Sequence, residues 1–163
     1  MSSLEDIYNS KLMELAANSP GSGRLGAPDA TATAHSKLCG STVTIDLNMD
    51  GDQVADYRQT VKACLLGQSS ASIMARYIVG STAAELRDVG AQTRTMLKSG
   101  GPVPSGAWPE GKWRELALLE PVREFKARHA STLLVFDAVE DALAKLERQR
   151  GSADATGRQA ASG

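Results

Sequence analysis

A period-two alternation of apolar and polar residues, followed at once by a turn dipeptide, constrains the fold of this chain most. Apolar side chains occupy every second position from Val43 to Met49, within a strand predicted over residues 39–49. Asp50-Gly51 follows, and this dipeptide favours a type I′ hairpin turn because both residues tolerate positive φ. A weaker alternation returns over residues 54–63. The pattern predicts an antiparallel hairpin with one buried face.

Helical periodicity surrounds this hairpin. Apolar residues spaced by three and four predict helices over residues 4–16, 69–79, 83–98 and 129–148, with a short one over 113–120. Ser81 or Thr82 would cap the third helix, and Gly100 would end it. We therefore expect an α+β fold, in which a small antiparallel β-sheet, with or without a third short strand, packs against several α-helices.

The length of 163 residues corresponds to one domain, which we place at residues 1–150. Residues 151–163 are rich in alanine, glycine and polar side chains, and this composition predicts a disordered tail. Aromatic residues make up only 4% of the chain, so the core must consist mostly of alanine, leucine, valine, isoleucine and methionine.

The charge balance argues against several classes of partner. Eighteen basic and nineteen acidic residues give a net charge of −1, which provides no basic surface for nucleic acid or an anionic membrane. No apolar run approaches the roughly 18 residues of a membrane span. The first residues lack the features of a secretory signal, and two cysteines form no disulfide framework. We expect a cytoplasmic location.

The hairpin gathers the two cysteines, Cys39 and Cys64, at its open end. A two-residue loop at Asp50-Gly51 would place Cys39 opposite Lys62, with Ser41 on the same face and the two thiols as diagonal neighbours. A four-residue loop would place the thiols directly opposite each other. Either register brings both sulfur atoms to the edge of the core.

Cys64 directly precedes a helix of small residues. The backbone N–H groups and the dipole at a helix start favour a thiolate, which is the form that binds metal and acts as a nucleophile. Gly67 would let the chain turn closely around whatever this thiolate binds. A free cysteine is also among the most buried residue types, so a purely structural role for Cys39 and Cys64 remains the alternative.

Three stretches resemble the scaffold proteins of iron–sulfur cluster assembly, the family of IscU, SufU and the NifU N-terminal domain. Cys39-Gly40-Ser41 is similar to the family's Cys-Gly-Asp at the head of a strand. Residues 64–74 are similar to its second cysteine and the Ser/Ala-rich helix that follows, which is the most specific match. Residues 131–139 resemble its C-terminal helix, and the likeness extends over about residues 4–146.

The resemblance implies a site in which three cysteines and a carboxylate hold a nascent cluster or a zinc ion. Here Ser41 stands at the carboxylate position. Ser131 stands at the third cysteine position, or Ala130 if the alignment slips by one residue. Two of the three expected thiols remain, Cys39 and Cys64, so the family's own ligand set is incomplete in this chain.

Two histidines flank the same motifs. His129 lies two residues before Ser131, and His35 lies four residues before Cys39. With Cys39 and Cys64 they would form a Cys2His2 set, which suits zinc or a Rieske-like cluster. The alternative for His129 is a hydrogen bond to the backbone at a helix start, and the alternative for His35 is a surface role.

Three functional hypotheses follow. The first is a cluster assembly scaffold, a carrier without enzymatic turnover, which receives iron and sulfur at Cys39 and Cys64 while His129 and Ser41 complete or shape the site. The second is a zinc-bound sulfur acceptor that stimulates a cysteine desulfurase. The third is a metal-free interaction module of the same fold.

The resemblance implies a cysteine desulfurase and apo iron–sulfur proteins as partners. Residues 119–123 correspond to the loop that Hsp70-type chaperones grip in IscU. Glu120 replaces a proline and Arg123 replaces a lysine in that loop, which argues against chaperone recognition. The structural interpretation of this segment is a turn or helix that begins at Pro121.

Overall fold

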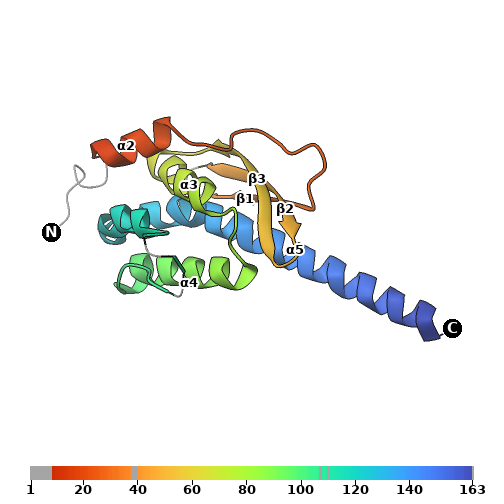
Figure 1. Cartoon of the computed structure of the whole chain (residues 1–163). Coiled ribbons are helices and arrows are strands. Elements are labelled where there is room, and N and C mark those ends of the chain that lie inside the picture. The colour runs from red at the N-terminus through yellow and green to blue at the C-terminus, as the bar shows by residue number, and fades with distance from the viewer. Residues whose placement is uncertain (1–8, 38–39, 107, 110, 163) are drawn as a thin grey trace.

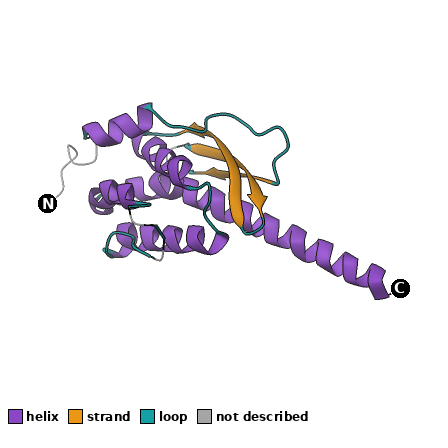
Figure 2. Cartoon of the chain, viewed as in Figure 1, coloured by secondary structure: helices purple, strands orange, loops and turns teal. Residues whose placement is uncertain are grey.

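The computed structural model describes residues 9–37, 40–106, 108–109 and 111–162, with side chains described as far as Gly151. In this part of the chain a three-stranded antiparallel sheet packs against helices, which confirms the predicted α+β class (Figures 1 and 2). The strands are β1 (Ala30–His35), β2 (Thr42–Asp50) and β3 (Gln53–Lys62), in the spatial order β1-β2-β3.

Strand β1 is the third short strand of the expected sheet, and it lies in a region where the sequence predicts neither a helix nor a strand. Its sequence alternates alanine and threonine, with Ala30 and Ala32 buried against the core. Alanine carries too little apolar surface to produce a clear period-two signal, so pairing with β2 decides the conformation of this segment.

The register predicted from a two-residue loop at Asp50-Gly51 is wrong, whereas the pairing of Met49 with Val54 next to the turn is that of the alternative with a four-residue loop. The structure pairs Asp50 with Gln53, so the two-residue loop is Gly51-Asp52, and Gly51 has the positive φ of +64°. A β-bulge between Asn48 and Met49 then shifts the pairing by one more residue, so that Lys62 lies opposite Thr42 instead of Cys39. A bulge leaves no clear mark on the alternation, so the sequence could not show this shift.

The helices are α2 (Ser10–Ala17), α3 (Leu65–Tyr77), α4 (Ala83–Ser99) and α5 (His129–Ser162), with the 3₁₀ helices η1 (Arg114–Glu124) and η2 (Lys126–Arg128). The side chain of Thr82 caps α4, and Gly100 ends it with a φ of +69°, as predicted. The described part of the first predicted helix begins at Ser10, where Asn9 caps α2 by accepting from the Leu12 N–H. Residues 4–8 lie outside the described residues.

Helix α5 organises the domain (Figure 1). It contacts β1, β2, α3 and α4, and α3 in turn contacts α2, β3 and η1. The core between them is mostly aliphatic, as predicted, with Trp113 among its largest fully buried side chains. No helix in the described part of the chain combines the length and apolar character that a membrane crossing requires.

The disordered tail over residues 151–163 stays a prediction. Helix α5 continues to Ser162 and leaves the body of the domain, as the blue end of the ribbon in Figure 1 shows. Near the point where it leaves, Arg150 donates a hydrogen bond to the carbonyl of Gly51, at 2.8 Å.

Candidate functional site

Cys64 is the N-cap residue of α3, which begins at Leu65, four residues before the start predicted at residue 69. Its backbone is extended, with φ −65° and ψ 173°, and its side chain makes no capping hydrogen bond to the helix. The residue is partly buried. The sulfur therefore lies at the positive end of a helix with capacity for another partner.

Ser131, which the resemblance places at the family's third cysteine position, lies next to this thiol. The Cys64 thiol donates to Ser131 Oγ at 3.4 Å, across 67 positions of sequence. The Ser131 hydroxyl itself donates to the carbonyl of Arg128 at 3.2 Å. The start of α5 thus brings a hydroxyl to the place where the resemblance predicts a third thiol.

Gly67 explains how the two helix starts can approach so closely. A Cβ atom at this position would lie 2.7 Å from the Cβ of Ala63 and 3.2 Å from the carbonyl oxygen of Ser131. Such a contact would push the first turn of α5 away from α3. The sequence predicts Gly67 as a turn residue, whereas the structure places it inside α3, where it provides space rather than a turn.

The strands converge on the same end of α3. His35 pairs with Thr42, and Thr42 pairs with Lys62, so β1, β2 and β3 end together just before Cys64. The connection from β1 to β2 is closed by a hydrogen bond from the Ser36 N–H to the Ser41 carbonyl, at 2.8 Å.

Ser41 is buried within this connection, with 3% of its surface exposed. Gly40 follows the other cysteine and has a φ of +69°, a left-handed conformation that glycine adopts without strain. Cys39 itself lies outside the described residues, so the predicted pairing of the two thiols stays a prediction.

His129 is the first residue of α5 and is 7% exposed. Its Nε2 donates to the carbonyls of Val122 and Arg123, at 3.1 and 3.0 Å. This is the backbone hydrogen bond that the sequence leaves open as an alternative, and it ties α5 to the end of η1. A ring that donates from Nε2 keeps the lone pair of Nδ1 for a metal, so the role of His129 as a ligand stays a prediction.

His35 lies on the exposed end of β1, and its Nδ1 hydrogen-bonds Thr42 Oγ1 at 3.0 Å. Within the described residues, which exclude Cys39, no group of three histidine, cysteine, aspartate or glutamate side chains is placed to hold a metal ion. The predicted Cys2His2 set is therefore not assembled from the described residues alone.

Residues 119–123 belong to η1 and are built into the domain. Leu119 and Val122 are fully buried, while Arg123 pairs with Glu120 and also donates to the carbonyl of Gly100. The segment is therefore structural, but the prediction that a helix or turn begins at Pro121 is wrong, because η1 begins at Arg114 and contains Pro121.

Comparison with solved structures defines the class of protein. The chain superposes on the N-terminal domain of a nitrogen-fixing NifU-like protein from Brucella abortus with a TM-score of 0.84 and 50% identity, over 89% of this chain and 97% of that one. FiSufU from Fervidobacterium islandicum AW-1 shares the fold at a TM-score of 0.76 and 21% identity, over 86% and 99% of the two chains. The domain is therefore an α+β domain of the NifU and SufU type.

The family follows from the sequence match. The NifU-like N-terminal domain family matches residues 7–132, and the chain belongs to this family. A curated relative is the iron–sulfur cluster assembly scaffold protein IscU of Thermotoga maritima, 24% identical over 144 residues, which are 87% of this chain and 96% of that protein.

Proposed function

We propose that this chain is an iron–sulfur cluster assembly scaffold, which receives iron and sulfur at Cys39 and Cys64 and passes the product to recipient proteins. The family and the relative IscU support the general role. The contact between Cys64 Sγ and Ser131 Oγ carries the proposal for this chain, because it joins two of the family's ligand positions. The protein is a carrier that ends each cycle unchanged, not an enzyme.

The chemistry begins with loss of the Cys64 proton to solvent, because a thiolate is the form that binds iron. In the structure the thiol donates a hydrogen bond to Ser131 Oγ. Once the thiolate forms, rotation of the Ser131 hydroxyl away from the Arg128 carbonyl lets it donate to the sulfur instead. Ser131 then stabilises the charged sulfur without replacing the missing thiolate.

Cys39 provides the second thiolate in this proposal, from the connection between β1 and β2. Ser41 and His129 complete or shape the site. Because Nε2 of His129 donates to two backbone carbonyls, Nδ1 is the ring nitrogen that would bind the metal. An iron–sulfur cluster normally has four protein ligands. A ligand set of two thiolates therefore favours a cluster that leaves easily, which suits a cargo destined for other proteins.

The first test is anaerobic reconstitution of the full chain with iron and sulfide. Cys64→Ser and Cys39→Ser should each lose the visible absorption of the cluster and most of the bound iron. Ser131→Ala keeps both thiols, and we expect it to load iron but to lose it faster to a chelator. Iron and sulfide loading of Cys64→Ser equal to that of the wild type would falsify the proposal.

A gain-of-function variant sharpens the test. Ser131→Cys introduces a third thiol next to Cys64, because the side chains of residues 64 and 131 are already in contact. We expect loss of bound iron or zinc to a chelator to slow by about tenfold or more, because a third tethered ligand must dissociate. Ser99→Cys, on the exposed end of α4, adds a thiol away from the site and should leave the rate unchanged.

A zinc-bound sulfur acceptor is the second candidate, and the uncapped position of Cys64 at the start of α3 favours it. In this case the Cys64 thiolate attacks the outer sulfur of a persulfide on a cysteine desulfurase. The S–S bond of that persulfide breaks, the desulfurase thiolate leaves, and Cys64 becomes the persulfide.

Metal analysis and intact mass distinguish the hypotheses. The second candidate predicts stoichiometric zinc, a mass gain of one sulfur atom that Cys64→Ser abolishes, and no visible iron–sulfur absorption. A protein that takes up neither metal nor sulfur would be the third hypothesis, an interaction module, and would overturn both of the others.

A further inference from the structure

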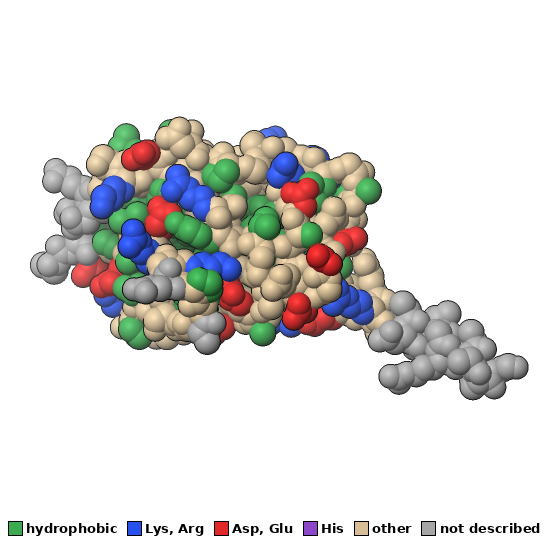
Figure 3. Space-filling view, viewed as in Figure 1, with side chains coloured by type: hydrophobic (Ala, Val, Ile, Leu, Met, Phe, Trp, Pro, Cys, Tyr) green, Lys and Arg blue, Asp and Glu red, His purple; other side chains and the backbone are tan. Residues whose placement is uncertain are grey.

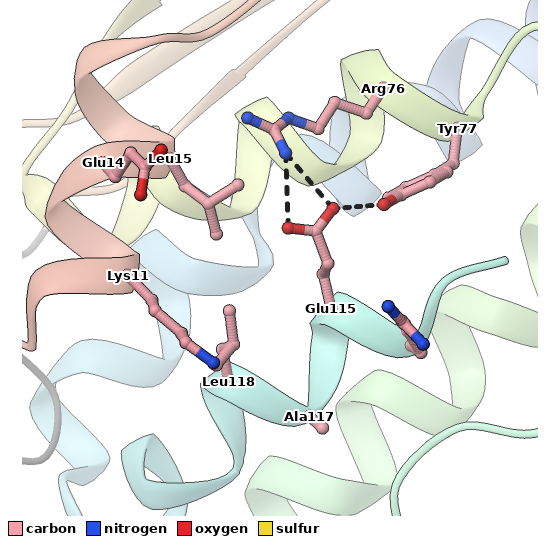
Figure 4. A pocket seen from close by; sticks show the side chains of 9 residues that line it. Lys11, Glu14, Leu15, Arg76, Tyr77, Glu115, Ala117 and Leu118 are labelled. Carbon is pink, nitrogen blue, oxygen red and sulfur yellow. Dashed lines mark hydrogen bonds and ion pairs between the residues drawn. The ribbon is translucent and has the colours of Figure 1, made fainter. Parts of the chain in front are cut away.

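A pocket of about 630 Å³ lies at the opposite end of α3 from Cys64. It is lined by residues of α2, the last turn of α3 and η1, as the close view in Figure 4 shows. Since α3 has 13 residues, this pocket and Cys64 are separated by about 20 Å along the helix axis. The volume falls in the range of roughly 300–1,000 Å³ that is typical of small-molecule sites.

The pocket has an apolar side. Leu15 of α2 is buried and points into the space toward Leu118 of η1 in Figure 4, and Ala117 lies on the same helix as Leu118. Tyr77 adds its ring, which is half-buried and packs against Trp113 with ring centroids 5.7 Å apart. A ligand with a short apolar chain can therefore leave water on entering this space.

One carboxylate of the lining is already neutralised. Glu115 forms an ion pair with Arg76, with Nη1 and Oε2 3.3 Å apart, and it also accepts the hydroxyl hydrogen of Tyr77. Burial and the neighbouring Glu115 raise the pKa of Tyr77, so its hydroxyl keeps the proton that it donates. Figure 4 shows these three side chains turned toward one another.

The remaining charges leave an excess of positive charge. The side chains of Lys11 and Arg114 line the pocket without a hydrogen bond or ion pair to any other described residue, and the same holds for the side-chain carboxylate of Glu14. The lining thus contains two cations and one carboxylate that have no such partner. Figure 3 shows basic and apolar side chains, with a few acidic ones among them, on the left of the view, over α3 and η1.

We propose that this pocket binds a small amphipathic carboxylate, with the carboxylate held by Lys11 and Arg114 and the apolar chain along Leu15 and Leu118. One net positive charge matches one carboxylate. Glu14 would repel a ligand with several negative charges, and the two cations would repel an amine. Charge-assisted hydrogen bonds from lysine and arginine to a carboxylate supply the specificity.

Octanoate is the probe for this proposal, added to the full isotope-labelled chain and followed by NMR. We expect saturable shifts of the Leu15 and Leu118 methyl signals and of the Tyr77 ring. Octanol and octylammonium, which share the chain but not the carboxylate, should bind about tenfold more weakly or not at all. Raising the salt concentration should weaken octanoate binding, because both cations are exposed to solvent.

Lys11→Gln combined with Arg114→Gln should weaken octanoate binding by about tenfold or more. Both residues are exposed, so the double variant should fold, which its NMR spectrum checks directly. Lys98→Gln, an exposed cation on α4, is the matched control and should bind like the wild type.

The proposal is overturned if octanol binds as tightly as octanoate, if the double variant binds like the wild type, or if the shifts map to another surface. It is equally overturned if a peptide that ends in a leucine carboxylate produces the expected shifts while octanoate does not, because the occupant would then be a protein segment.

Discussion

Asp46 and Cys64 are two polar side chains of the same domain that differ in burial and in the number of hydrogen bonds they make. The Asp46 side chain is fully buried and accepts hydrogen bonds from Arg24, from the Leu25 N–H and from Thr31 Oγ1, at 2.6–3.1 Å. Cys64 is only partly buried, and within the described residues its side chain makes one hydrogen bond, the 3.4 Å bond to Ser131 Oγ.

The difference separates a structural polar group from a functional one. The hydrogen bonds from Arg24 and Leu25 hold the segment between α2 and β1 against β2. Together with the bond from Thr31, they satisfy the buried Asp46 carboxylate. The Cys64 sulfur makes no capping hydrogen bond to α3, so it keeps bonding capacity beyond its bond to Ser131 among the residues that the structure describes. Losing the first group should therefore affect stability, and losing the second should affect function.

The first prediction compares the two residues directly. Asp46→Asn should lower the free energy of unfolding by about 2–3 kcal/mol, because it removes the charge from several hydrogen bonds at a buried position. Cys64→Ser should change the same quantity by less than about 1 kcal/mol. Urea denaturation at pH 7 measures both.

Asp56→Asn is the matched control for the first prediction. Asp56 also lies on the hairpin and pairs with Arg58, but 48% of its side chain is exposed. Its loss should lower the free energy of unfolding by no more than about 1 kcal/mol. If Cys64→Ser were as destabilising as Asp46→Asn, the proposed contrast between the two sites would be wrong.

The second prediction concerns pH. Burial alone would raise the pKa of Asp46, but the hydrogen bonds from Arg24, Thr31 and Leu25 outweigh it and lower this pKa below its usual value. The stabilisation is therefore complete above the unfolded pKa of about 3.9 and is lost as the pH falls through the lower folded value. The difference in unfolding free energy between wild type and Asp46→Asn should be constant from pH 7 to 5 and shrink below pH 4. A difference that stays the same at pH 3 would contradict this assignment.

Much of this architecture is predictable from the sequence. The alternation from Val43 to Leu47 correctly predicts the buried face of β2, and Thr82 and Gly100 correctly delimit α4. These features depend on local patterns, and local patterns persist in the folded chain.

Other features depend on contacts that no local pattern reveals. Asp46 stands on the polar side of the alternation, yet it is buried, because the segment that contains Arg24 folds over it. The contact of Cys64 with Ser131 joins residues 67 positions apart, and only the family resemblance pointed to Ser131. The role of Gly67 needed the packing of α5 on α3 to become visible.

The third prediction tests whether the Cys64 end of α3 depends on this close packing. Gly67→Ala should lower the free energy of unfolding by about 1–3 kcal/mol, since its Cβ would lie within 3.2 Å of the backbone of Ser131. Gly90→Ala in α4 is the matched control, because its Cβ would make an ordinary 3.6 Å contact with Phe136. The control should raise stability by up to about 1 kcal/mol through helix propensity. Equal effects of the two variants in thermal denaturation would show that α3 and α5 are not closely packed at Gly67.

The fourth prediction compares the part of α5 that packs in the domain with the part that leaves it, and it concerns the smallest expected change in the free energy of unfolding. Truncation after Arg150 removes the part of α5 that leaves the domain and keeps the bond from Arg150 to Gly51. Such a short segment, which includes Gly151 and Gly157, gains little stability from helix propensity alone. The free energy of unfolding should therefore change by less than about 0.5 kcal/mol.

Leu146→Ala provides the control in the same helix, four residues before the cut. Leu146 is only 8% exposed, so its truncation should lower the free energy of unfolding by about 2–3 kcal/mol. Together the two variants locate the end of the folded unit, which the sequence predicts at residue 150. If the truncated chain lost more than about 1 kcal/mol, the end of α5 would stabilise the domain through contacts of its own, and the boundary would lie further along the chain.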